Sequence, residues 1–345
     1  MGPARLHDVA RRAGVSPSTA SRALNGVGEL APQTRAAVVR AAAELSYRPS
    51  PQARSLRTRR SMTIGLVVPT ISHAFYGAVT HGVQAVLDEH DYRLVLVDST
   101  EDPVSVRRAL ETLLDQRVDG LLVSTAPIAA ADFNELLGST PCVFVDELAP
   151  GSGVGNIALE NARGVTLLVD HLAEHGHRRI AYMGGPLDRT SGRERLQGFL
   201  DAMERRDLPV EQALVREGRW TIASGFEEGM ALMSVPDQPT ALITASGELA
   251  LGALAATRRR RIAIPGELAL VCFDDLYFAP LLQPSLTAVA YDARAMGTEA
   301  ARLLLAAMED GDPRSSELRI AVSLVRRRSC GCVYDPAAAL AEVVA

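Results

Sequence analysis

A regular alternation of apolar runs and amphipathic stretches, starting at Met62, is the feature that most constrains the fold. Apolar runs predict strands, and hydrophobic residues at three- and four-residue spacing between them predict helices. In a first series the predicted strands cover residues 64–68, 94–98, 120–124 and 142–146, and the predicted helices cover 76–89, 103–116 and 130–137. A second series has predicted strands at 180–183, 242–244 and 268–273, with helices near 163–174, 192–205, 224–233 and 249–259. This alternation is typical of parallel sheets with right-handed crossovers, so we predict an α/β core of two doubly wound parallel-sheet lobes.

Residues 6–25, LHDVARRAGVSPSTASRALN, precede that core and predict two short helices around a tight turn. Gly14 supplies the turn, where a residue without Cβ costs little. Ser16 is a good N-cap, and Pro17 suits the first helical position. Small polar residues and one arginine are left facing outward from the second helix: Ser18, Thr19, Ser21 and Arg22. The pattern is typical of a helix-turn-helix whose second helix enters the major groove, with an ordinary helical hairpin as the alternative.

A third helix is predicted over residues 32–46, where apolar residues again recur at helical spacing. Pro49 ends this segment, because proline does not continue a helix and disfavours one just before it. The three helices together would form a small all-α headpiece.

The run DVARRAGVSPSTASRALNG resembles the headpiece of the LacI/GalR (lactose-repressor) family, whose pattern is D-V-A-x-x-A-G-V-S-x-x-T-V-S-R-x-L-N. The match departs mainly at Ala20, where the family usually has Val. The resemblance extends over essentially the whole chain and implies a periplasmic-binding-protein-like core. It implies a headpiece at 1–49, a hinge at 50–61, a core at 62–329 and a tail at 330–345. Within the core it implies an N-lobe of about 62–161 and 292–320 and a C-lobe of about 162–290 and 321–329, with the chain crossing between lobes near Asn161, Tyr291 and Ala321.

Residues 50–61, SPQARSLRTRRS, carry several arginines around Leu56. Composition alone predicts a flexible basic linker. The family resemblance implies instead a hinge helix that forms on DNA, with Leu56 wedged into the minor groove. The residues predicted to contact DNA are Leu6, Ser16, Pro17, Ser18, Thr19, Ser21, Arg22, Asn25, Arg54, Leu56 and Arg57.

Charge is distributed unevenly between the head and the rest of the chain. Residues 1–61 hold 11 Arg and 3 acidic residues, a net charge of +8, whereas the remaining residues carry −13. The chain has no Lys, so every cationic side chain that contacts a phosphate must be Arg. A basic head on an acidic body fits a protein that reads nucleic acid with its head only.

The loops at the carboxyl ends of the predicted strands are the expected place for a ligand. Arg195, in RLQGF, resembles the family's effector-binding arginine, although it could be an exposed helix charge and Arg193 lies close by. Trp220 is the only Trp and could be a core residue, but it falls where sugar-responsive members place an aromatic ring. Asp274 belongs to an F-D-D motif whose first Asp takes ligand hydroxyls in the family, and it could otherwise cap a turn. The predicted effector-binding residues are Phe75, Asp146, Arg195, Trp220, Ser246, Asp274 and Tyr291.

One of these positions departs from the family. Ser246-Gly247-Glu248 stands where the family typically has Asn-Asp, which puts the identity of the effector in doubt but not the pocket. A guanidinium, a carboxylate and an aromatic face together suit a neutral polyol, so the expected effector is a sugar or sugar derivative.

Several other classes are disfavoured by what the sequence does not contain. No apolar run is long enough for a membrane span and the N-terminus lacks a signal-peptide core, so a cytoplasmic, nucleoid-associated protein is expected and a transport-type sugar-binding protein is not. No Walker loop, G-x-G-x-x-G, G-x-S-x-G or HExxH is present, so neither a cofactor nor an enzyme is expected. Cys330-Gly-Cys332 is too sparse for a metal site without added ligands, so no metal is expected and a structural or neutral role is assigned to the pair.

The prediction is a transcriptional repressor that binds a pseudo-palindromic operator and is switched by a small-molecule effector. Residues 335–345 are too short for a heptad zipper of several turns, so a homodimer is expected and not a tetramer.

Overall fold

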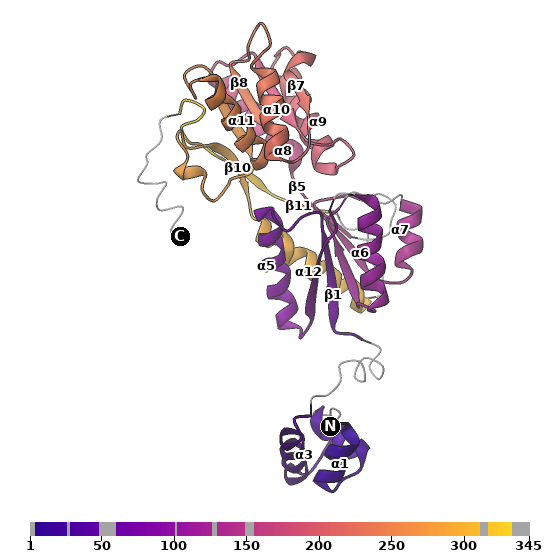
Figure 1. Cartoon of the computed structure of the whole chain (residues 1–345). Coiled ribbons are helices and arrows are strands. Elements are labelled where there is room, and N and C mark those ends of the chain that lie inside the picture. The colour runs from indigo at the N-terminus through magenta and orange to yellow at the C-terminus, as the bar shows by residue number, and fades with distance from the viewer. Residues whose placement is uncertain are drawn as a thin grey trace. The chain divides into compact units, whose positions relative to one another are not determined.

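The computed structural model describes residues 4–25, 28–47, 60–100, 102–125, 130–148, 155–310 and 317–332. The chain forms two compact units, Met1–Thr63 and Ile64–Ala345, which Figure 1 shows as the headpiece and the core. A search of the described residues found no helix with the length and apolarity to span a membrane.

The headpiece contains the three predicted helices, α1 (Leu6–Ala13), α2 (Pro17–Leu24) and α3 (Pro32–Glu44). Gly14 ends α1 with φ of 68°, the left-handed conformation that the turn requires. Val9, Ala20 and Val38, one from each helix, are fully buried and form the centre of a small apolar core. The helix-turn-helix prediction is confirmed, and α3 is two residues shorter than expected at its C-terminal end.

The first lobe of the core is a six-stranded sheet in the order β11-β5-β4-β3-β1-β2. Its strands are β1 (Thr63–Val68), β2 (Arg93–Asp98), β3 (Gly120–Val123), β4 (Cys142–Val145), β5 (Gly155–Leu159) and β11 (Glu317–Ile320). Its helices are α5 (Ala74–Glu89), α6 (Pro103–Asp115), α7 (Ala130–Leu137) and α12 (Ala293–Asp310). β1, β3, β4, β5 and β11 pair in parallel.

Helices cover both faces of this sheet (Figure 1). Leu121 of β3 packs in one apolar cluster with α6 and α7, whereas a side chain at the adjacent Gly120 would meet Leu304 of α12. On the α12 side, α5 and α12 approach so closely that a Cβ at Gly82 or Gly297 would collide with the backbone of the other helix. Only glycine permits that contact.

The second lobe has the strand order β12-β10-β9-β8-β6-β7. Its strands are β6 (Ile180–Gly184), β7 (Val215–Glu217), β8 (Ala241–Thr244), β9 (Ala269–Phe273), β10 (Thr287–Tyr291) and β12 (Val322–Val325). Its helices are α8 (Asn161–Glu174), α9 (Thr190–Arg205), α10 (Ile222–Leu232) and α11 (Gly247–Arg260), with short 3-10 turns η1 (Gln212–Leu214) and η2 (Ala279–Leu281). β12 pairs antiparallel with β10, so this otherwise parallel sheet has one antiparallel edge strand.

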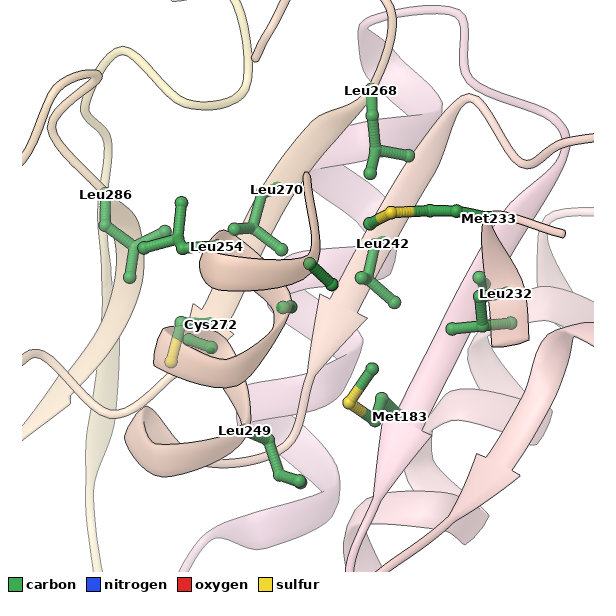
Figure 2. Close-up of a cluster of buried hydrophobic side chains, with 14 of the residues drawn as sticks. Met183, Leu232, Met233, Leu242, Leu249, Leu254, Leu268, Leu270, Cys272 and Leu286 are labelled. Carbon is green, nitrogen blue, oxygen red and sulfur yellow. The ribbon is translucent and has the colours of Figure 1, made fainter. Parts of the chain in front are cut away.

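The core of the second lobe lies between this sheet and α10 and α11 (Figure 2). Met183, Leu242 and Leu270 come from three neighbouring strands and are at most 1% exposed, and Leu249 of α11 packs against them. Cys272 is fully buried in the same cluster, where its thiol packs as a small apolar group.

Seven strands were predicted, and all are present with ends within one residue of those expected. Two doubly wound lobes are thereby confirmed. The chain passes between the two sheets three times, from β5 to α8, from β10 to α12 and from β11 to β12. These crossings bring loops from both lobes to one cleft.

Candidate ligand-binding and DNA-binding sites

A cavity of about 580 Å³ lies between the two lobes, at the carboxyl ends of their strands. Its walls come from loops after β1, β2 and β4 in the first lobe and after β6, β7, β8 and β9 in the second. All seven residues predicted to bind effector line this cavity: Phe75, Asp146, Arg195, Trp220, Ser246, Asp274 and Tyr291. Their contact with an effector remains a prediction.

Arg195 lies on α9, and its guanidinium contacts three other residues of the protein. Its Nε donates to Asn161 Oδ1 at 2.8 Å, and its Nη1 donates to the Ala245 carbonyl at 2.6 Å. The guanidinium carbon lies 3.7 Å from the centre of the Phe273 ring. Two of its five N–H groups are thus used by the protein, and the donor fork available to a ligand is smaller than the sequence suggested. Arg193 is exposed and donates to the carbonyls of the loop before α9, so Arg195, and not Arg193, lines the cavity.

Asp274 follows β9 with φ of 127°, a strained value for a residue with a side chain. Its Oδ1 accepts from the Tyr291 hydroxyl at 2.6 Å, and its Oδ2 accepts from the Gly247 amide at 2.9 Å. Burial raises the pKa of this carboxyl, and Arg195 acts in the opposite direction. The carboxylate is held rigidly, with one lone pair on each oxygen still available for a ligand.

Asp146 follows β4, also with positive φ, at 62°. Its Oδ1 is buried and has no hydrogen-bond partner among the described residues. Burial raises the pKa of Asp146 to about 7, with Arg195 acting to lower it. A buried acceptor without a donor is costly, and a ligand hydroxyl would satisfy it.

Aromatic side chains form the apolar part of the cavity. The Trp220 indole lies directly over the Gly185 backbone, where any Cβ would collide with the ring. Phe75 contacts Tyr291 edge to face, with ring centres 6.0 Å apart. Ser246 is buried and its hydroxyl accepts from the Leu249 amide at 3.3 Å, so part of its hydrogen-bonding capacity serves to begin α11.

The sequence analysis missed a contact between an imidazole and a carboxyl group in the cavity wall. His73 Nε2, before α5, lies 3.5 Å from Glu248 Oε1 in the first turn of α11. Burial raises the pKa of Glu248, and His73 acts to lower it. Each of the two residues lies two positions from a predicted site residue, His73 before Phe75 and Glu248 after Ser246. That proximity in the sequence is the signal that could have identified them.

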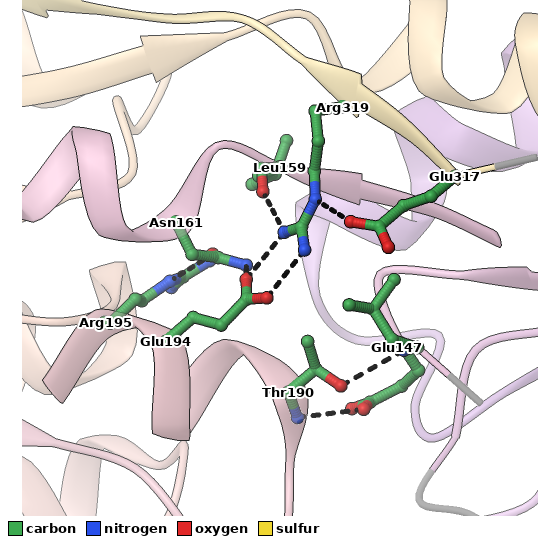
Figure 3. A network of polar contacts seen from close by, with 9 residues as sticks. Glu147, Leu159, Asn161, Thr190, Glu194, Arg195, Glu317 and Arg319 are labelled. Carbon is green, nitrogen blue, oxygen red and sulfur yellow. Dashed lines mark hydrogen bonds and ion pairs between the residues drawn. The ribbon is translucent and has the colours of Figure 1, made fainter. Parts of the chain in front are cut away.

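A second group of polar contacts joins the lobes next to the cavity (Figure 3). Glu147, after β4, pairs with Arg189, before α9, at 2.7 Å, with only 3% and 6% of their side chains exposed. Glu147 Oε2 also accepts from the Thr190 amide at 2.9 Å. Farther along α9, Glu194 forms a bidentate pair with Arg319 of β11, at 2.7 Å for both contacts. No local sequence signal marks these pairs, because their partners lie more than 40 residues apart.

In the headpiece, the residues predicted to contact DNA differ in exposure. Ser16, Ser18 and Arg22 are exposed, whereas Leu6 packs against the apolar core of the three helices. The Ser16 hydroxyl accepts from the Thr19 amide at 3.1 Å, and Asn25 donates to the Ser21 carbonyl at 2.6 Å. The remaining predicted contacts in this unit are half-buried: Pro17, Thr19, Ser21 and Asn25. The hinge residues Arg54, Leu56 and Arg57 lie outside the described part of the chain.

Comparison with known families gives two matches, one in each unit. Residues 5–50 match the model of bacterial regulatory proteins of the lacI family, and residues 169–330 match the model of a periplasmic binding protein-like domain. Among curated proteins, the HTH-type transcriptional repressor PurR of Haemophilus influenzae (strain PittEE) is 31% identical over 331 residues, which are 94% of this chain and 98% of the relative. The HTH-type transcriptional repressor CytR of Escherichia coli (strain K12) is 30% identical, over 89% of this chain and 90% of its own.

Solved structures are similar over nearly the whole chain. The Lac repressor dimer bound to operator and the anti-inducer ONPF has a TM-score of 0.86 at 29% identity, covering 95% of this chain and 99% of its own. The complex of the transcriptional regulator CelR with cellobiose has a TM-score of 0.72 at 31% identity, covering 94% and 99%. The similar proteins are transcriptional regulators and not enzymes.

Proposed function

This chain belongs to the lacI family of bacterial regulatory proteins, and from that premise we propose that it is a repressor of transcription that binds its operator as a homodimer and is switched by a neutral sugar. The observation that carries the proposal is the composition of the cavity wall. It combines remaining guanidinium donors on Arg195, carboxylate acceptors on Asp146 and Asp274, and the indole of Trp220.

The charges of the cavity favour a neutral ligand. Its lining contains four carboxylates, Asp98, Asp146, Glu248 and Asp274, against the two arginines Arg189 and Arg195 and the histidine His73. A phosphorylated sugar would add negative charge to a wall that is already rich in carboxylates, whereas a hydroxyl pairs with a carboxylate or a guanidinium without a counter-charge. The sugar in the similar CelR–cellobiose complex supports the same class of ligand.

A nucleobase is the second candidate, and the cavity supports it less well. Base edges are recognised by paired donors and acceptors such as a side-chain amide offers. The stretch Ser246-Gly247-Glu248 lacks the Asn that the family typically has there, and the Ser246 hydroxyl accepts from the Leu249 amide.

The proposed DNA contacts follow from the exposed part of α2. Ser18 and Arg22 are exposed on this helix, and a guanidinium can pair with O6 and N7 of guanine in the major groove. A dimer would present two such helices to half-sites about one helical turn apart, or a multiple of it. Leu56 would enter the minor groove between the half-sites, where apolar side chains kink the duplex. The solved structure of the similar Lac repressor, a dimer bound to operator, supports binding to an operator as a dimer.

The test is binding of the full-length protein to the DNA upstream of its own gene, measured by fluorescence anisotropy with and without a panel of neutral sugars, sugar phosphates and purines. Thermal unfolding against the same panel identifies the ligand independently of DNA. We expect one class of neutral sugar to raise the midpoint of unfolding and to change operator affinity. Stabilisation by a purine or a sugar phosphate alone would reject the sugar assignment, and absence of sequence-specific binding to the upstream DNA would contradict the proposed binding to an operator there.

A further inference from the structure

A cluster of two imidazoles and two thiols lies in the second lobe, and none of its members lines the cavity. His171 lies in the last turn of α8 and His175 caps its C-terminal end, four residues later, so their side chains project from the same face of the helix. The turn at 328–331 returns the chain to α8 and brings Cys332 Sγ to 3.2 Å from His175 Nε2 and 3.7 Å from His171 Nε2. We call His171, His175, Cys330 and Cys332 the thiol–imidazole cluster.

Cys330 lies on the buried side of the cluster. Its Sγ is 3.1 Å from His171 Nε2 and 3.0 Å from the Thr287 hydroxyl, and the residue is 3% exposed. His171 is equally buried at 3%, whereas His175 is exposed and Cys332 is half-buried. The cluster therefore has an anchored inner side and an outer side that is open to an incoming ion.

We propose that the thiol–imidazole cluster binds a zinc-class metal ion through His171 Nε2, His175 Nε2 and Cys332 Sγ, with Cys330 adjacent to the fourth position. Two imidazoles and a thiolate form a borderline-soft ligand set that suits Zn²⁺. Ligand atoms around a tetrahedral zinc ion, with bonds of about 2.3 Å to sulfur and about 2.0 Å to nitrogen, lie about 3.5 Å apart. Cys332 Sγ lies 3.2 Å from His175 Nε2 and 3.7 Å from His171 Nε2, and the ligand atoms of all three residues lie within 4.8 Å of one another, so a small movement would bring them around the ion.

The surroundings of His175 prepare it as a ligand. Its Nδ1 lies 2.8 Å from the His171 carbonyl oxygen, which only accepts, so Nδ1 carries the proton and the lone pair of Nε2 faces Cys332. Hydrogen bonding of the second ring nitrogen to a carbonyl is the usual way in which proteins orient a metal-binding histidine. The cluster also lies at the C-terminal end of α8, where the helix dipole favours a cation.

His90 provides a matched comparison within the chain. It ends α5 as His175 ends α8, and its Nδ1 lies 2.9 Å from the Val86 carbonyl oxygen in the same way. Among the described residues, only His171, His175 and Cys332 form a group of three with metal-binding geometry, and His90 belongs to no such group. Any metal bound through exposed histidines in general would depend on His90 as much as on His175.

A bound ion would join the last described residues of the chain to α8. Those residues already contact the sheet, because the Ser329 hydroxyl donates to the Leu270 carbonyl at 2.5 Å and accepts from the Thr287 amide at 2.9 Å. The ion would extend this anchoring by three residues, to Cys332, and would stabilise the folded lobe in proportion to its affinity.

The experiment uses full-length protein without an affinity tag, kept reduced by a phosphine. Co²⁺ is added first, because a thiolate ligand produces a sulfur-to-cobalt charge-transfer band, and Zn²⁺ affinity is then measured by competition with a chromophoric chelator. We expect the charge-transfer band in the native protein and its displacement by Zn²⁺. Absence of the band would overturn the proposal.

Three variants assign the ligands. Loss of outer-shell partners alone weakens metal sites about 10- to 100-fold, so Cys332→Ser and His175→Ala, which remove ligands, should weaken Zn²⁺ binding at least about 100-fold. His90→Ala should bind as the native protein does. Thermal unfolding of the three metal-free variants checks that each is folded, and all three altered side chains are at least partly exposed. Native affinity in Cys332→Ser and His175→Ala, or an equal loss in His90→Ala, would show binding by scattered surface groups and reject the cluster.

Discussion

The headpiece and the cavity differ in how their functional side chains relate to the fold. In the headpiece, Ser18 and Arg22 are exposed on α2, and the apolar core is built from other positions. In the cavity, Arg195 also holds Asn161, and Asp274 also holds Tyr291. A substitution in the headpiece should therefore remove a proposed contact with DNA and leave the fold intact, whereas a substitution in the cavity should remove a proposed ligand contact and a structural contact together.

The two units also differ in charge. The basic residues 1–61 carry +8 and the remainder carries −13, and the cavity mixes carboxylates with arginines. DNA binding by the headpiece should depend strongly on salt, whereas binding of a neutral ligand in the cavity should not.

The largest expected effect tests this contrast. If the headpiece neutralises about 6–10 phosphates, operator affinity should fall about 10³- to 10⁵-fold between 50 and 200 mM salt, because counterions released from DNA oppose binding. Affinity for the neutral effector, measured by calorimetry over the same range, should stay nearly constant. The measurement for DNA is fluorescence anisotropy at a series of salt concentrations. An operator affinity that does not change with salt concentration would contradict DNA binding by the headpiece.

The next effect compares two ion pairs, one in each unit. Glu147–Arg189 in the core is almost completely buried, whereas Arg12–Glu44 in the headpiece, at 2.8 Å, has 61% and 51% of its side chains exposed. Removing one partner of a buried pair costs about 3–5 kcal/mol, since the other charge stays buried, and an exposed pair contributes at most about 1 kcal/mol. Arg189→Met should therefore lower the free energy of unfolding far more than Arg12→Met.

Chemical denaturation followed by circular dichroism measures both variants. Glu147→Gln combined with Arg189→Met is the control, because the amide removes the uncompensated charge and can still accept from the Thr190 amide. Part of the lost stability should return in this double variant. Equal stability of the two single variants would contradict the contrast between the two pairs.

The sequence predicted many of the strands and helices that a local residue pattern identifies. It missed strands that depend on partners distant in the sequence. The sequence predicted β1, β2, β3, β4, β6, β8 and β9, and it missed the interior strands β5 and β10 together with β7, β11 and β12. β7, with the sequence VRE, and β11, with ELRI, are short, exposed edge strands whose pattern resembles a loop. They become strands because a neighbouring edge offers hydrogen-bond partners, which no local pattern records.

The same distinction applies to the sites. Arg195, Trp220 and Asp274 were found because each lies in a stretch that resembles the family, and the structure places all three in the cavity wall. The thiol–imidazole cluster was missed because the added ligands that Cys330-Gly-Cys332 lacks come from α8, about 160 residues earlier in the chain. The contacts of Arg195 with Asn161 and with the Ala245 carbonyl also join residues distant in the sequence, so the sequence could not predict that two of its donors are already used.

The third prediction concerns the charged residues of the cavity. Loss of a hydrogen bond to a charged group costs about 1.5–3 kcal/mol, so Arg195→Ala and Asp274→Ala should each weaken effector binding about 10- to 150-fold. Both should also lower the free energy of unfolding, because Asn161, Tyr291 and the Gly247 amide lose partners. Arg22→Ala in the headpiece is the counterpart and should weaken operator binding with little change in stability.

Calorimetry measures binding of the identified effector, and fluorescence anisotropy measures binding to operator DNA in the absence of effector. Together they distinguish a loss of effector binding from a loss of operator binding. In the absence of effector, the operator affinity of Arg195→Ala and Asp274→Ala should equal that of the native protein. Native effector affinity in Arg195→Ala and Asp274→Ala would place the ligand elsewhere, and a large loss of stability in Arg22→Ala would contradict the separation of function from folding in the headpiece.

The smallest effect is a dependence on pH that arises from Asp146. Burial raises its pKa from 3.8 to about 7, so the folded protein holds this proton more tightly than the unfolded chain does. The resulting stabilisation of the effector-free protein is complete below about pH 4 and is lost as pH rises to about 7. Asp146→Asn keeps a neutral side chain at every pH, so its stability relative to the native protein should increase over the same interval.

Effector binding should respond to Asp146 in the opposite direction. A ligand hydroxyl that donates to the unpartnered Oδ1 favours the ionised carboxylate, so effector affinity should rise up to about 10-fold between pH 6 and 8 and then level off. In Asp146→Asn this rise should disappear, while operator affinity follows the same pH profile as in the native protein. Calorimetry at half-unit steps of pH measures the profile. An effector affinity in Asp146→Asn that still rises through pH 7 would assign the titration to another group, and the neighbouring carboxyls Asp274 and Glu147, whose pKa values burial also raises, would be the next to substitute.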